Sequence, residues 1–151
     1  MDDLRDLYQS VILDHNKSPR NFGNLEDANR SAEGYNPLCG DKLSLQLILD
    51  DDECVVDIRF TGMGCAISTA SASLMTEYAR GKTLSEILET MNRFHELLTG
   101  NPNEQGEAED LGKLAVFSGV REFPARVKCA TLSWHTLQAA LDDGDKVATT
   151  E

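Results

Sequence analysis

The chain has 151 residues, which is enough for one domain over residues 1–151 with a substantial hydrophobic core. Its 26 acidic residues outnumber its 14 basic ones, and the formal net charge of -12 argues against binding to nucleic acid or an anionic membrane surface and favours a partner with a basic docking face. No apolar run is long enough to span a membrane, and Met1-Asp2-Asp3 is unlike the basic start of a signal peptide, so we expect a protein of the cytoplasm.

The first predicted element is an amphipathic helix near the N-terminus. Its apolar residues recur at intervals of three and four, which places them on one helical face. They are Leu4, Leu7, Tyr8, Val11 and Ile12. Ser18-Pro19 and Gly23 end this helix, and the following stretch up to residue 40, rich in Asn and Gly, predicts a long loop.

A β-hairpin is predicted next. Leucines at every second position from Leu43 to Leu49 give the period of a half-buried strand, and the acidic residues 50–53 supply a turn. The returning strand is predicted to bury one face, formed by Cys54, Val56, Ile58 and Phe60. On that face Cys54 behaves as a small hydrophobic residue, so we do not count it as a candidate ligand.

Three helices are predicted in the second half of the chain. The first follows Cys65, consists of small side chains and ends before Gly81, which suits the position after a helix. A capping box from Thr83 to Glu86 opens the second, which ends before Gly100, and residues 101–110 predict a polar surface segment. The third is predicted from Pro124 to Gly144. Its core stripe is Val127, Ala130, Trp134, Leu137 and Leu141.

Cys39 and Asp41 are the most informative pair in the sequence. Residues i and i+2 of an extended chain project to the same side, so the thiol and the carboxylate can converge on one point. Cys65 stands at a loop-to-helix junction, where backbone amides favour a thiolate, and Cys129 lies in the last predicted helix. In a reducing compartment such cysteines are typical of metal binding or catalysis, and three thiols with one carboxylate fill a tetrahedral zinc site or hold an iron–sulfur cluster.

Arg126 is a candidate for balancing the charge of this site. Three thiolates and a carboxylate exceed the charge of a divalent metal, and a guanidinium three residues before Cys129 could offset part of the excess. Plain core packing of Cys65 and Cys129, and a solvated position for Arg126, remain open alternatives because the chain has no CxxC pair.

The motifs resemble the IscU/NifU-N family of iron–sulfur scaffold proteins over nearly the whole chain. They are Leu13-Asp14-His15, Pro19-Arg20-Asn21, Asn36-Pro37-Leu38-Cys39-Gly40-Asp41, the segment from Phe60 to Ser68, and the helix of Cys129. Within the family, the chain is most similar to the SufU branch. Lys128 stands where classical scaffolds carry a ligand histidine, Phe123-Pro124-Ala125-Arg126-Val127-Lys128 replaces their chaperone motif, and extra residues lie around 101–119.

The resemblance implies an α+β fold of the SufE/NifU type, with a small antiparallel sheet covered by helices and a metal site at one end. It implies zinc bound by Cys39, Asp41, Cys65 and Cys129. It also implies that Cys39 accepts persulfide sulfur from a SufS-type, pyridoxal-phosphate-dependent cysteine desulfurase, after a histidine of that partner replaces Cys39 on the metal, and passes it to the Suf machinery. Arg126 is expected to steady the anionic site or the persulfide.

Two other functions stay open at this point. One is a scaffold that assembles a [2Fe–2S] cluster on the same four residues, which thiolate chemistry also permits. The other is a regulator of the desulfurase in which the metal is purely structural. We expect His15, His95 and His135, all on predicted helices, to serve packing or surface roles rather than metal binding.

Overall fold

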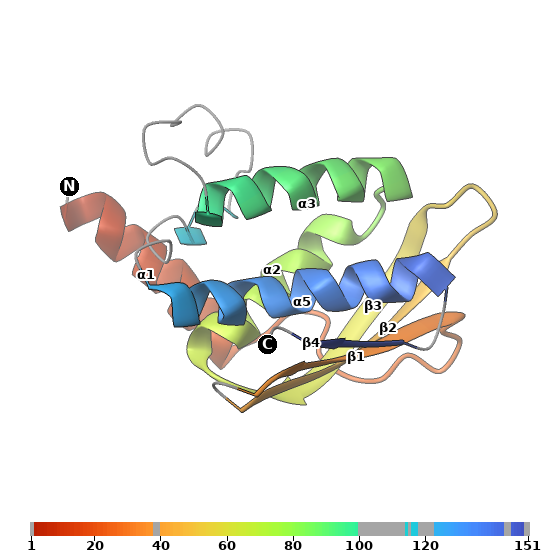
Figure 1. The fold of residues 1–151 in the computed structure, drawn as a ribbon, viewed down its shortest axis with the longest axis horizontal. Coiled ribbons are helices and arrows are strands. Elements are labelled where there is room, and N and C mark those ends of the chain that lie inside the picture. Colours follow the sequence, from red (N-terminus) through yellow and green to blue (C-terminus); the bar gives the residue numbers. More distant parts are fainter. Residues whose placement is uncertain are drawn as a thin grey trace.

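The computed structural model describes residues 2–37, 40–99, 114, 116, 117, 123–143 and 146–149. Its elements form an α+β fold, as predicted (Figure 1). In chain order they are α1 (Asp2–Lys17), β1 (Arg30–Asn36), β2 (Asp41–Leu49), β3 (Val55–Met63), α2 (Ala66–Ala79), α3 (Leu84–Thr99), α5 (Pro124–Asp143) and β4 (Lys146–Thr149). In this part of the chain no helix is long and apolar enough to cross a membrane.

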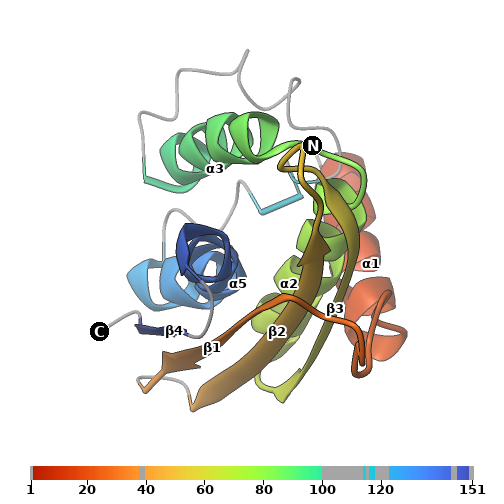
Figure 2. The same cartoon turned by 90° about the vertical axis from the view of Figure 1, so that its right-hand side faces the viewer.

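The strands form one sheet in the order β3-β2-β1-β4. β2 is antiparallel to both β1 and β3, and the short β4 adds a parallel strand next to β1. Helix α5 packs on β1 and β2, and α2 packs on β3, while α1 lies against α2 and α3 against α5. Figure 2 shows this arrangement, with α5 on the side of β1 and β4 and α2 on the side of β3.

Helix α2 is the centre of the helical layer, and its small residues let neighbouring helices come close. Ser71 is fully buried, and its hydroxyl donates a hydrogen bond of 2.6 Å to the carbonyl oxygen of Ala130 in α5. On the other side, the hydroxyl of buried Ser73 lies 2.7 Å from Nδ1 of His15 in α1. Hydrogen-bonded serines therefore join α2 to both α1 and α5, and both of these buried hydroxyls have a hydrogen-bond partner.

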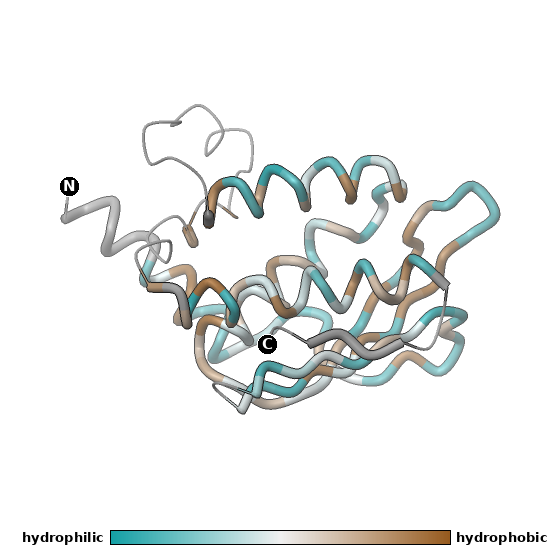
Figure 3. Tube along the Cα trace, viewed as in Figure 1, coloured by the Kyte–Doolittle hydropathy of each residue, from teal (hydrophilic) through white to brown (hydrophobic). Residues whose placement is uncertain are grey.

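The capping box, the glycine after α2 and the turn of the hairpin are confirmed, whereas Gly100, Gly144 and the predicted polar segment 101–110 lie outside the described residues. Thr83 and Glu86 make the reciprocal bonds of a capping box, with the backbone N–H of each residue donating to the other's side-chain oxygen. Gly81 follows the end of α2 with a φ of 84°, the left-handed conformation that glycine adopts readily. Figure 3 shows the predicted turn of the hairpin as a hydrophilic tip between β2 and β3.

The predicted loop before residue 40 is wrong, because it contains strand β1. The inward-facing residues of β1 are Ala32, Gly34 and Asn36, which give no apolar alternation in the sequence. Gly34 is required by packing: a Cβ there would lie 2.1 Å from Oγ1 of Thr136 in α5. Strand β4 was not predicted either.

The predicted phase of the returning strand is also wrong at its start. Leu49 pairs with Val55 while Ile48 pairs with Asp57, so Val56 is the extra residue of a β-bulge. The bulge buries Val55 completely and leaves Val56 51% exposed, whereas Ile58 and Phe60 face the core as predicted. Cys54 lies before the strand and is half-buried rather than part of the core face.

Candidate metal centre

Three of the four predicted ligands meet at one end of the molecule. A carboxylate oxygen of Asp41 and the sulfur atoms of Cys65 and Cys129 all lie within 4.8 Å of one another. Asp41 begins β2, Cys65 precedes α2, and Cys129 lies in the second turn of α5. The starts of these three elements come together at the same end of the fold (Figure 1).

Cys65 is held by the beginning of α2. It is the N-cap residue, with extended backbone angles of φ -70° and ψ 168°, and its sulfur accepts a hydrogen bond of 3.4 Å from the backbone N–H of Ser68. The first turn of a helix presents unpaired N–H groups and a partial positive charge. Both features stabilise an anionic sulfur, so Cys65 is well placed to act as a thiolate ligand.

Asp41 is buried, with 2% of its surface exposed, and is fixed from two sides. Its Oδ1 accepts a hydrogen bond of 2.9 Å from the backbone N–H of Cys65, and its Oδ2 accepts one of 3.0 Å from Nδ2 of Asn36. Gly64 makes the first contact possible, because a Cβ at that position would lie 2.5 Å from Oδ1 of Asp41. A buried carboxylate ion held in this way needs a positive partner, which a metal ion would provide.

Cys129 is 2% exposed and is joined to Asp41 by Asn36. Nδ2 of Asn36, which donates to Asp41, also donates to the sulfur of Cys129 over 3.4 Å. Asn36 belongs to the motif that contains Cys39 and Asp41, but the sequence predicts no role for it. The only local signal for it was its place next to Pro37, at the start of the segment that contains Cys39 and Asp41.

The donor set fits zinc. Two thiolates and a carboxylate are typical zinc ligands, and in a tetrahedral site with Zn–S bonds of about 2.3 Å the ligand atoms lie roughly 3.8 Å apart. The observed limit of 4.8 Å is close to that spacing. Cys39, the predicted fourth ligand, lies outside the described residues, so its part in the site stays a prediction. Cys54 is not a member of this cluster.

Arg126 lies three residues before Cys129 in the first turn of α5. Its side chain is exposed, and the guanidinium carbon stands 4.6 Å from the centre of the Phe123 ring, a cation–π contact. The contact keeps a positive charge at the end of the molecule where the ligands meet. Its predicted action on the metal site or on a persulfide stays a prediction.

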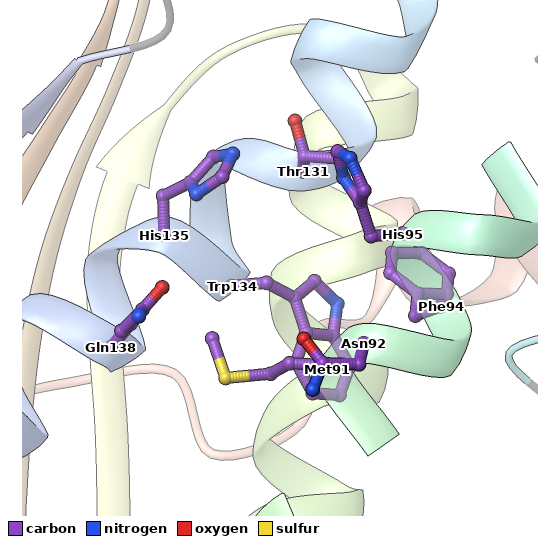
Figure 4. Close-up of a pocket in the computed structure, with 8 residues that line it drawn as sticks. All are labelled: Met91, Asn92, Phe94, His95, Thr131, Trp134, His135 and Gln138. Carbon is purple, nitrogen blue, oxygen red and sulfur yellow. The ribbon is translucent and has the colours of Figure 1, made fainter. Parts of the chain in front are cut away.

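The histidines lie away from the ligand cluster. His15 is 2% exposed and packs between α1 and α2. His95 and His135 line a pocket of about 230 Å³ between α3 and α5, together with Trp134 (Figure 4). The side chain of His135 is exposed at the rim of this pocket, and partial desolvation of its ring, followed by the nearby charge of His95, lowers the pKa of His135.

Comparisons with known proteins agree with this fold. The family model of the NifU-like N-terminal domain matches residues 7–142. The chain is 44% identical over 135 residues to the zinc-dependent sulfurtransferase SufU of Bacillus subtilis, covering 89% of each chain. It is 41% identical to the iron–sulfur cluster assembly scaffold protein IscU of Streptococcus pyogenes, over 91% of this chain and 84% of that one.

A solved structure is similar as well. It is a protein from Fervidobacterium islandicum named as an iron–sulfur cluster assembly scaffold for the SUF system. It superimposes with a TM-score of 0.79 at 39% sequence identity, over 87% of this chain and 94% of that chain.

Proposed function

The chain belongs to the family of NifU-like N-terminal domains, which acts in iron–sulfur cluster assembly, and on this premise we propose that it is a zinc-dependent sulfur-transfer protein. The observation that carries the proposal is the approach of Asp41, Cys65 and Cys129 to within 4.8 Å of one another. Cys39 completes the ligand set. Bound zinc would keep these thiolates deprotonated at neutral pH without taking part in redox chemistry.

The proposed reaction is a thiol–persulfide exchange. The thiolate of Cys39 attacks the outer sulfur of a persulfide on a SufS-type cysteine desulfurase. The sulfur–sulfur bond of the donor breaks, its cysteine leaves as a thiolate, and Cys39 carries the new persulfide. The exchange needs no external oxidant or reductant. Asp41, Cys65 and Cys129 stay in place because backbone and amide donors hold them.

Two features favour sulfur transfer over cluster assembly. Lys128 precedes Cys129, and a lysine ammonium group has no lone pair to offer iron at neutral pH. The second feature is the segment from Phe123 to Lys128, which stands where classical scaffolds of the family carry a chaperone motif. The second candidate function, a [2Fe–2S] scaffold, is favoured by the similarity to IscU proteins.

The proposed partner is a pyridoxal-phosphate-dependent cysteine desulfurase of the SufS type, and the Suf machinery is the proposed recipient of the sulfur. The net charge of -12 favours a partner whose docking face is basic.

The test begins with metal analysis of the purified protein, followed by mixing with a SufS-type desulfurase and cysteine. We expect zinc near one ion per chain and a persulfide mapped to Cys39 by mass spectrometry. Cys54→Ser should behave like wild type, since Cys54 lies outside the cluster. A coloured, iron-containing protein that passes its cluster to an apo-ferredoxin would support the scaffold instead. Full desulfurase activation by Cys39→Ser would indicate a regulator that carries no sulfur.

A further inference from the structure

Asn36 is the buried polar side chain that touches two ligands of the metal centre. It is the last residue of β1, pairs with Asp41 in the sheet and has no exposed surface. One nitrogen, Nδ2, donates to Oδ2 of Asp41 over 3.0 Å and to the sulfur of Cys129 over 3.4 Å. An amide nitrogen carries two hydrogens, so it can serve both acceptors at once.

The chemistry of the two partners fixes which way the amide faces. A carboxylate and a thiolate are acceptors only, so the NH₂ group must face them, and the opposite orientation would place an oxygen against two anions. This orientation turns the amide oxygen away from the two ligands. Within the described part of the chain, Oδ1 of Asn36 is buried and has no hydrogen-bond partner. An unpaired buried carbonyl lowers the free energy of unfolding. Asn36 is therefore kept at this position although it destabilises the fold.

We propose that Asn36 is a positioning residue of the metal centre, an inference that rests on the proposed metal binding. Its two N–H groups hold Asp41, at the start of β2, at a fixed separation from Cys129 in α5. They also place partial positive charge between two anionic ligands that would otherwise repel each other. Hydrogen bonds from outside the ligand set orient ligands and tune the metal in this way.

The N–H···S bond has an electronic consequence besides its geometric one. A donor to a thiolate sulfur withdraws electron density and lowers the energy of the sulfur lone pairs. Loss of the donor raises that energy, and the charge-transfer band from sulfur to a bound Co²⁺ then moves to longer wavelength. A role for Asn36 in folding alone would leave this band unchanged.

The test compares Asn36→Leu with Asn29→Leu. Leucine keeps the branch point and the number of heavy atoms of the asparagine side chain, although it is bulkier, and it removes the donors. Asn29 precedes the other end of β1 and also loses side-chain bonds to the backbone when replaced, so it controls for general destabilisation. We expect Asn36→Leu to weaken zinc binding about 10–100-fold in chelator competition. Its Co²⁺ band should move to longer wavelength, while Asn29→Leu matches wild type in both measurements.

Asn36→Asp provides a second variant that keeps the shape of the side chain if the leucine variant does not fold. It replaces the donors by a carboxylate beside two anions, so zinc binding should again weaken. Wild-type zinc affinity and an unshifted Co²⁺ band in the folded Asn36 variants would overturn the inference. Failure of the wild-type protein itself to bind zinc would instead overturn the proposed function.

Discussion

Gly64 controls how closely the segment before α2 approaches the carboxylate of Asp41. In Gly64→Ala the new Cβ would meet Oδ1 of Asp41 at 2.5 Å, so one of them must shift. We expect zinc affinity to fall roughly tenfold or more, as when other supports of a ligand are lost. The free energy of unfolding should fall by about 1–3 kcal/mol, the usual effect of overpacking.

Met63→Ala is the neighbouring control for this change. Met63 is 75% exposed, so its truncation removes little packing and no member of the ligand cluster. Chelator competition and thermal unfolding of both variants measure the two effects. Equal zinc affinity in Gly64→Ala and wild type would show that the position of Asp41 does not depend on Gly64.

Arg126 supplies a second prediction for a single residue. Arg126→Ala removes a positive charge near the ligand cluster but no ligand, so we expect slower persulfide transfer with unchanged zinc content. Arg93→Ala is the matched control: it also removes one exposed arginine, from an ion pair with Glu89 in α3. Transfer at the wild-type rate in Arg126→Ala would remove the proposed role, and transfer slowed equally in both variants would assign the effect to overall charge.

Helices α3 and α5 each contribute one histidine, His95 and His135, to the same pocket. We therefore expect the packing of α3 on α5 to depend on pH. The pKa of His135 is lowered first by partial desolvation of its ring and second by the charge of His95. The folded protein protonates His135 less readily than the unfolded chain does. The contribution of the neutral His135 ring to the free energy of unfolding is therefore present above the ordinary histidine pKa of about 6.5, and it is lost as the pH falls below that value.

The measurement is an NMR titration of the His135 ring in wild type and in His95→Gln. We expect the pKa of His135 to lie below its ordinary value in wild type and to rise in the variant, which removes the neighbouring charge. The rise should be incomplete, since partial desolvation is the larger cause. A His135 pKa at the ordinary value in wild type would contradict this description of the pocket.

Elements with strong local signals could be predicted from the sequence, and those shaped by distant contacts could not. The capping box at Thr83 and the glycine after α2 act within a few residues, so the sequence alone reveals them. Strand β1 was missed because α5 requires glycine at position 34 and two ligands require asparagine at position 36. Their partners in α5, Thr136 for Gly34 and Cys129 for Asn36, lie far from them in the sequence.

The same distinction applies to the candidate site. Ligand types such as Cys65 and Cys129 stand out in a sequence, and the family resemblance selected them. The amide of Asn36 does not stand out, because its importance arises from a contact with a residue 93 positions away. The bulge at Val56 was likewise invisible, since it depends on register with β2.

The metal centre is expected to affect the stability of the whole molecule, because its ligands come from β2, α2 and α5. An ion that binds only the folded chain stabilises it by an amount that grows with concentration, about 2.7 kcal/mol at 100 times the dissociation constant. We therefore expect the Tm to rise with added zinc and to fall on chelation. Removing zinc should loosen the end of the fold where β2, α2 and α5 begin.

Variants of two cysteines separate this effect from nonspecific zinc binding. Cys129→Ser removes a buried member of the cluster and should abolish most of the zinc-dependent rise in Tm, whereas Cys54→Ser, outside the cluster, should retain it. The two apo variants provide the baseline, since each loses one thiol. An equal response to zinc in both variants would mean that the ion does not bridge these elements. A response confined to chains with Cys129 would identify the metal centre as the junction that holds the sheet and its two covering helices together.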